Sequence, residues 1–186
     1  MKKILLAAVA ATSLMSAPAF AAPLDLKAFA ITANVQAECS LEALSDVNFG
    51  QLAIETDPGA GALRITGNEN SAQRAWASCN YPVTIRLRSL LGGLRTAQLN
   101  DGPDSADFTN RINYRLSLSP SNGSAFTGAE LVTDNTGGIN QTIDAVQPDA
   151  FHDRAVVRVR VLRADNPLRP LAGTYADVAT ITLGAI

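Results

Sequence analysis

The sequence predicts an all-β protein, an antiparallel β-sandwich, and three observations support this. Apolar residues alternate with polar ones in several short segments, which is the pattern of a strand with one buried face. Turn residues separate these segments, as at residues 57–59 (Asp-Pro-Gly) and 100–103 (Asn-Asp-Gly-Pro). No stretch of a dozen residues keeps a helical stripe with capping residues. Many short strands with frequent turns are typical of a sandwich or barrel.

The first 21 residues have the pattern of a bacterial secretory signal peptide. Lys2 and Lys3 precede an apolar run, and residues 19–21 (Ala-Phe-Ala) fit the small-x-small rule for cleavage. We therefore expect residues 1–21 to be removed during export and to take no part in the fold. Their loss would remove two lysines and no acidic residue, which would change the formal net charge from −2 to −4.

Length and composition indicate one exported domain without an integral membrane segment. Of the 186 residues, 47% are hydrophobic and 17% are charged, which excludes a disordered, heavily charged protein. After the signal peptide, no apolar run is long enough to span a bilayer. A mildly acidic protein does not attract phosphate backbones, so we expect no nucleic-acid partner.

The first predicted strand covers residues 27–38 and ends at Cys39. Its apolar row consists of Phe29, Ile31, Ala33 and Val35, with polar or small residues between them. Such a strand can pair within its own molecule. It can also pair with a neighbouring chain, because an unpaired sheet edge promotes association.

Four further segments show the alternation expected of strands. They are residues 83–88, 112–119, 157–162 and 175–183. Residues 120–150 are the least patterned part of the chain, and we expect a long, loop-rich connection with short strands there.

Cys39 and Cys79 are the only cysteines, and both follow the signal peptide. In an oxidising compartment they are expected to form one disulfide, which the chain-entropy model values at roughly 4 kcal/mol for a loop of about 40 residues. A zinc site is not expected, because two distant cysteines and the single histidine, His152, do not make a ligand set.

Catalytic and metal-binding residues are not expected. His152 lies beside Asp153, but there is no Gly-x-Ser-x-Gly elbow to supply a nucleophile, so we interpret it as a surface or strand-edge histidine. Asp101, Asp104 and Asp107 lie in a turn-rich loop and lack the glycine and closing glutamate of a calcium loop. The chain is therefore predicted to have no enzymatic activity and no cofactor.

Trp76, the only tryptophan, lies three residues before Cys79. We expect it to pack in the core near the disulfide, as in other sandwiches, with a sugar-binding platform as the alternative. Two arginine pairs, Arg86 with Arg88 and Arg158 with Arg160, are expected on outward faces, in solvent or in cross-strand ion pairs.

Several motifs, in order along the chain, resemble one known family, the spore coat protein U domain. This domain is shared with the archaic class of chaperone–usher pilins. The similarity covers nearly all of residues 22–186 and is weak over residues 120–150. The matching segments are residues 35–40, 47–52, 77–85, 113–116 and 173–183. The motif residues are Phe49, Gly50, Gly173, Tyr175 and Asp177, of which the Gly-Thr-Tyr-x-Asp run at 173–177 is the most specific.

The resemblance implies an incomplete immunoglobulin-like sandwich that lacks its final strand and exposes a hydrophobic groove in its place. A periplasmic chaperone would fill this groove first. At an outer-membrane usher, the N-terminal segment of the next subunit would then replace the chaperone, by donor-strand complementation. Residues 22–38 would be this donor segment, and residues 39–186 the pilin domain.

In that reading Phe29, Ile31, Ala33 and Val35 enter successive pockets of the next subunit. The product would be a head-to-tail polymer of identical or related subunits, displayed on the cell surface as a fimbria. The alternative function is a secreted monomeric coat or carbohydrate-binding module with the same sandwich. Truncation before Glu38 separates the two, because only the polymer depends on a donor segment for its next subunit.

Overall fold

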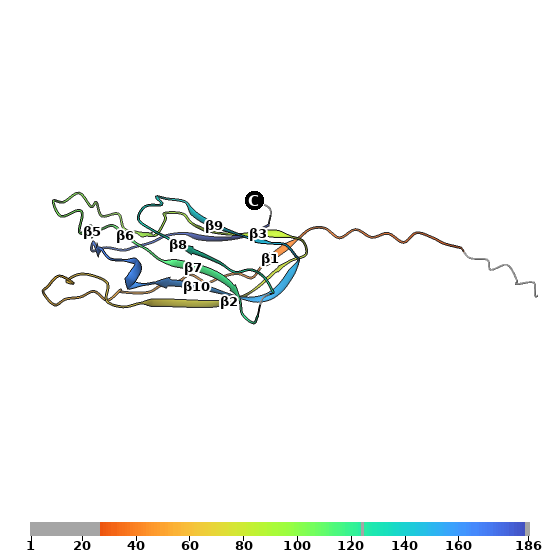
Figure 1. Ribbon diagram of the computed structural model, residues 1–186, viewed down its shortest axis with the longest axis horizontal. Helices are drawn as coiled ribbons and strands as arrows, with labels where there is room; N and C mark the ends of the chain where they lie inside the picture. The colour runs from red at the N-terminus through yellow and green to blue at the C-terminus, as the bar shows by residue number, and fades with distance from the viewer. Residues whose placement is uncertain (1–26, 124, 185–186) are drawn as a thin grey trace, which may run out of the picture. The chain divides into compact units, whose positions relative to one another are not determined.

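A computed structural model of the chain describes residues 27–123 and 125–184 (Figure 1). The predicted signal peptide and residues 22–26 of the predicted donor segment lie outside the described residues. The chain divides after Val35 into two parts. In the described residues nearly all regular structure is β-strand, and the exception is a 3-10 turn, η1 (Arg163–Asp165).

The described residues of the first part, 27–35, belong to no strand. Their apolar side chains are exposed to solvent, by 81% at Phe29, 83% at Ile31 and 81% at Val35. The predicted strand over 27–38 is therefore wrong for this isolated chain, and the first strand is β1 (Cys39–Leu41). Alternation determines which side chains share a face, but a strand also needs a partner for its backbone hydrogen bonds.

The second part, residues 36–186, contains a five-stranded antiparallel sheet with the order β1-β2-β10-β7-β8 (Figure 1). Its inward side chains are apolar or small, and its outward ones are mostly polar, as expected for a sheet with one solvated face. The strands after β1 are β2 (Glu69–Cys79), β10 (Phe151–Val161), β7 (Arg115–Pro120) and β8 (Ala129–Val132).

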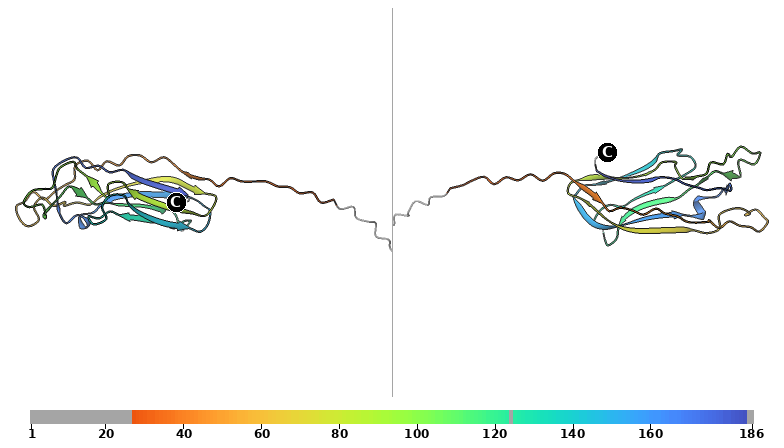
Figure 2. Two further views of the ribbon diagram at one scale, coloured as in Figure 1. Left: turned by 90° about the horizontal axis from the view of Figure 1, so that it is seen from above. Right: turned by 180° about the vertical axis from the view of Figure 1, so that it is seen from behind.

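A second antiparallel sheet has the order β12-β3-β9 and forms the other layer of the fold (Figure 2). Its strands are β12 (Ala179–Gly184), β3 (Val83–Ser89) and β9 (Gln141–Gln147). Two short ladders complete the described strands. They pair β4 (Leu94–Arg95) with β6 (Arg111–Ile112), and β5 (Phe108–Thr109) in parallel with β11 (Arg169–Pro170).

One hydrophobic core lies between the two larger sheets. Ile85 and Leu87 of β3 and Leu116 and Leu118 of β7 are fully buried in it. The fold is thus all-β with antiparallel sheets arranged as a sandwich, which confirms the predicted fold class at this level.

The predicted disulfide is present and joins the first two strands. Cys39 of β1 lies directly opposite Cys79 of β2, and the two sulfur atoms are bonded. This covalent link fixes the start of the second part to the edge of the larger sheet.

The strand predictions were correct in part. Residues 83–88 lie within β3 and residues 157–161 within β10, whereas Leu162 lies outside it. The segment 112–119 is divided between β6 and β7, with residues 113–114 in neither, and the segment 175–183 becomes a strand only from Ala179. The eleven-residue β2 was not expected over its full length, because its most deeply buried residues before Cys79, Ala75 and Ala77, are small and give a weak periodic signal.

The position of Trp76 differs from the expected one in the core near the disulfide. It is 45% exposed, on the outer face of the larger sheet, and does not lie in the core. The cause is strand alternation, because the neighbouring residues Ala75 and Ala77 point inward and are almost completely buried.

Among the described residues, no helix is long and apolar enough to cross a bilayer.

Candidate binding groove

The second part of the chain contains an apolar groove of about 1220 Å³. It lies between residues 44–54, which follow β1, and residues 170–181, which lead into β12. Ile112, Tyr114 and Leu116 are buried on its floor, together with Val157 of β10. The apolar side chains on its rims are partly buried at Val47, Phe49, Leu52, Leu171, Tyr175 and Ile181 and exposed at Leu44, Ile54 and Val178.

One rim forms because the chain leaves the larger sheet after Leu41. The Glu42 N–H still bonds to the Trp76 carbonyl at 2.9 Å. At Ser45, the side-chain amide of Gln73 takes the place of a strand partner. Its oxygen accepts a hydrogen bond from the Ser45 N–H (2.8 Å), and its nitrogen donates one to the Ser45 carbonyl (2.7 Å). Over residues 46–52 no backbone–backbone hydrogen bond is present in the described residues.

The other rim includes β12. It pairs with β3 on one side, and among the described residues no strand pairs with its other side. Ala179 and Ile181 of β12 line the groove. The groove therefore has apolar side chains on its floor and backbone without a strand partner at its rims, the combination that accepts an added β-strand.

All five motif residues from the sequence line this groove: Phe49, Gly50, Gly173, Tyr175 and Asp177. They come from segments more than 120 residues apart in the sequence. Gly50 adopts a φ of 66°, in the left-handed region, and its N–H donates to the Asn48 side chain at 2.8 Å. This turn places the Phe49 ring against the core.

Asp177 connects the start of the β12 rim to the body of the fold. Its carboxylate accepts hydrogen bonds from the Tyr114 hydroxyl (2.8 Å), the Leu91 N–H (2.8 Å) and the Ser89 hydroxyl. It also accepts one from the N–H of Val178 at 2.7 Å. Burial raises the pKa of Tyr114 above its ordinary value, and the neighbouring Asp177 carboxylate adds to this shift.

Tyr175 and Gly173 shape the loop before Asp177. The Tyr175 hydroxyl donates to the Leu171 carbonyl at 2.8 Å, and burial raises the pKa of Tyr175 to about 12. At Gly173, φ is 152° and a Cβ atom would lie 2.5 Å from the Thr96 hydroxyl oxygen. Glycine is therefore required at this position by backbone conformation and by space.

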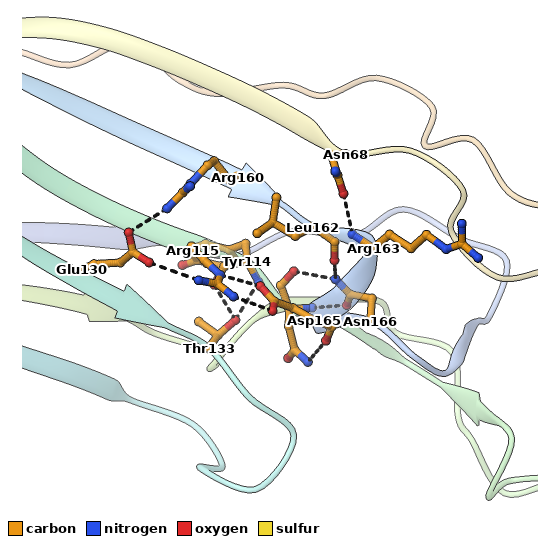
Figure 3. Close-up of polar contacts among 11 residues, drawn as sticks. Asn68, Tyr114, Arg115, Glu130, Thr133, Arg160, Leu162, Arg163, Asp165 and Asn166 are labelled. Atoms are coloured by element: carbon orange, nitrogen blue, oxygen red, sulfur yellow. Dashed lines mark hydrogen bonds and ion pairs between the residues drawn. The ribbon is translucent and has the colours of Figure 1, made fainter.

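The 113–116 segment carries a polar cluster that fixes the floor of the groove (Figure 3). Buried Asn113 and Asn166 bond reciprocally, from the Asn113 N–H to the Asn166 side chain (2.7 Å) and from that side chain to the Asn113 carbonyl (3.0 Å). The Tyr114 N–H donates to buried Thr133 at 2.8 Å. These bonds hold the backbone on both sides of the Tyr114 ring.

Charged residues surround this cluster (Figure 3). The Arg115 guanidinium forms a bidentate pair with Asp165, at 2.7 and 2.8 Å, and lowers the pKa of the Asp165 carboxyl. The Glu130 carboxylate forms ion pairs with Arg115 at 3.4 Å and with Arg160 at 2.7 Å. The η1 turn, which contains Asp165, is thereby tied to β7.

The remaining sequence candidates lie outside the groove. His152 is exposed on β10, and its ring stacks on Trp76 with 4.8 Å between ring centroids. Asp101 and Asp104 lie exposed in their loop, while Asp107 pairs with Arg169 at 3.7 Å. In the described residues no group of three or more His, Cys, Asp or Glu side chains could hold a metal ion.

The four outward arginines were expected either in solvent or in cross-strand ion pairs, and two of them form ion pairs with residues of other strands, whereas Arg158 is exposed. Arg86 pairs with Asp144 at 2.7 Å, which raises the pKa of Arg86 and lowers that of Asp144. Arg160 pairs with Glu130. Arg88 bonds to the Asn140 side chain instead.

Sequence reasoning missed the parts of the groove rim over residues 44–54 that lie outside the motif segment 47–52, namely residues 44–46 and Ile54. These residues form no strand and their apolar side chains have no regular period, so only their position beside the groove identifies them.

Comparison with protein families found no family model that matches the chain, and no curated protein matches it.

Proposed function

We propose that this chain is a structural subunit of a surface fimbria, assembled by donor-strand complementation. The observation that carries the proposal is the apolar groove beside β12, whose outer side has no strand partner in the described residues. The same chain carries, in residues 27–35, an exposed segment with alternating apolar side chains. The groove is an acceptor and this segment is the donor for the next copy.

Strand order supports an immunoglobulin-like interpretation. In constant-type immunoglobulin domains, strands A, B, E and D form one sheet and strands C, F and G the other. Here β1-β2-β10-β7 has the order A-B-E-D, and β3-β12 has the order C-F. Strand G would lie beside β12, on the side that has no partner among the described residues.

The donor side chains have a suitable size and spacing. Phe29, Ile31, Ala33 and Val35 repeat every second residue, so an extended conformation directs all four to one face. Burial of Phe29, Ile31 and Val35 would contribute about 1.5–3 kcal/mol each. Backbone hydrogen bonds to β12 would add to this, and a head-to-tail contact of this kind continues as an open filament.

The proposed route includes export by the signal peptide and disulfide formation in the periplasm. A periplasmic chaperone occupies the groove until an outer-membrane usher joins the subunits. The exposed apolar residues at the rims support the need for a chaperone, because an unpaired apolar edge promotes aggregation.

The donor role is tested by Phe29→Asp and Ile31→Lys, which should stop fibre growth and leave chaperone binding intact. Thr32→Lys is the matched control, because residue 32 lies on the opposite face of the alternating segment. Electron microscopy of surface fibres and co-purification with the chaperone measure the two properties. Unchanged fibres in both donor variants would remove the donor role from these residues.

A monomeric secreted module is the competing outcome. In that case the purified chain would remain a stable monomer without any partner, and truncation before Glu38 would leave its assembly state unchanged.

A further inference from the structure

The outer face of the five-stranded sheet carries a row of arginines beside an aromatic stack. Cross-strand pairing places Arg154 opposite Trp76, Val156 opposite Arg74, and Arg158 opposite Ala72. Directly opposed residues project to the same face, so all three arginines lie together on the solvent side. We call Arg74, Trp76, His152, Arg154 and Arg158 the arginine face.

The positive charge of this face is not fully neutralised within the described residues. Arg74, Arg154 and Arg158 are exposed, and none of them forms an ion pair there. Of the neighbouring carboxylates, Glu130 is paired with Arg115 and Arg160. Glu42 accepts a hydrogen bond from the Trp76 N–H at 3.0 Å and keeps its charge, so it offsets one of the three arginines.

The aromatic part of the face is ordered by several contacts. The Trp76 and His152 rings are nearly parallel, at 4°, and the Arg154 guanidinium carbon lies 5.8 Å from the Trp76 ring. The Ser78 hydroxyl bonds to His152 Nδ1 at 2.6 Å. Trp76 remains 45% exposed beside these charges, and His152 is exposed as well.

Three cross-strand neighbours on this face have small or hydroxylated side chains that do not project far from the sheet. Ala72 lies opposite Arg158 on one side, Ser117 lies opposite it on the other, and Ser119 lies opposite Val156. An extended ligand that lies along the sheet can therefore contact the guanidinium groups, the rings and the hydroxyls together.

We infer that the arginine face binds an acidic polysaccharide, a chain of sugars bearing carboxylates. Guanidinium groups match carboxylates in bidentate geometry, and their charge complements a polyanion. The aromatic stack offers a surface for the apolar face of a sugar ring, and the serines offer partners for sugar hydroxyls.

Each subunit alone would bind weakly, because exposed charge pairs are individually weak and are screened by salt. A fibre would repeat the face along its length and strengthen binding by multivalency. That last step rests on the proposed function, whereas binding by a single subunit does not.

The test measures binding of the mature chain to immobilised polygalacturonate, with dextran as the neutral polysaccharide. Arg74→Glu/Arg154→Glu should weaken binding about tenfold or more, and added salt should weaken binding of the unmodified chain. Arg64→Glu/Arg163→Glu is the charge-matched control, because both residues are exposed and neither belongs to the arginine face. Arg158→Glu alone supplies a second variant if the double variant fails to fold.

Equal binding to dextran, or equal weakening by the control variant, would overturn the inference. Equal binding to single-stranded DNA would also overturn it, since the face would then be a general polyanion surface. Loss of self-association in the double variant, without polygalacturonate binding by the unmodified chain, would assign the face to a second copy. A chain that binds polygalacturonate but forms no fibre would retain this inference and reject the proposed function.

Discussion

The Tyr114 hydroxyl donates a hydrogen bond of 2.8 Å to the Asp177 carboxylate, across 63 residues of sequence. Tyr114 lies on the floor of the groove and Asp177 on its rim. This bond therefore links the residues that lead into β7 to the residues that lead into β12.

Tyr114→Phe should lower the free energy of unfolding by about 1–2 kcal/mol, because it removes this bond and leaves the ring in place. Urea denaturation measures the change. Tyr81→Phe is the control, because Tyr81 is partly buried against the same core and its hydroxyl has no hydrogen bond in the described residues. Equal losses in the two variants would contradict a specific role for the Tyr114–Asp177 bond.

In an alkaline titration, Tyr114 and Tyr175 should ionise at a higher pH than an unfolded tyrosine does. The pKa of Tyr175 is raised to about 12 and that of Tyr114 is raised as well, mainly by burial. A raised pKa means that the folded state favours the neutral phenol. The resulting stability is fully present below about pH 10, the pKa of an unfolded tyrosine, and is lost as the pH rises through the folded values. Tyrosinate absorbance measures this, and full ionisation at about pH 10 without unfolding would contradict the buried environment.

The ion pair of Arg115 and Asp165 should make stability depend on acid pH. The pKa of Asp165 is lowered in the folded state by Arg115, so its contribution is present above the unfolded value of about 4 and is lost as the pH falls through the folded value. Asp165→Asn should therefore destabilise the protein at neutral pH and have little effect in strong acid. Asp149→Asn, at an exposed residue without a hydrogen bond or ion pair in the described residues, is the control. A destabilisation by Asp165→Asn that does not change with pH would contradict this account.

Replacement of both Cys39 and Cys79 by alanine should lower the free energy of unfolding by roughly 2–4 kcal/mol. The bond closes a loop between residues 40 apart in the sequence and ties β1 to β2. Chemical denaturation with and without a reducing agent checks this. Reduction should bring the unmodified chain to the stability of the variant, and an unchanged midpoint would contradict a stabilising role.

Val178→Lys should block fibre growth from the acceptor side, because it places a charge at the rim of the apolar groove. Val178 is 60% exposed, so folding should tolerate the change. Val146→Lys is a close control, since Val146 is 68% exposed on β9 and does not line the groove. Fibre yield and chain stability are measured for both, and fibres from Val178→Lys at the level of the control would contradict the acceptor role of the groove.

The sequence alone determined the fold class, the disulfide and several strands. Alternation at residues 83–88 and 157–162 identified strands because large inward side chains repeat every second residue there. The two cysteines left one possible pair. In each case the signal is local or follows from composition, so it needs no knowledge of long-range contacts.

Tertiary structure decided the rest. Alternation at residues 27–38 predicted a strand, yet the segment forms none in the described chain, because strand formation requires a partner. Trp76 points outward because the register of β2 directs Ala75 and Ala77 inward. The groove depends on where Phe49, Tyr114 and Asp177 meet, and contacts between residues so distant in sequence are set by chain topology, which no local pattern encodes.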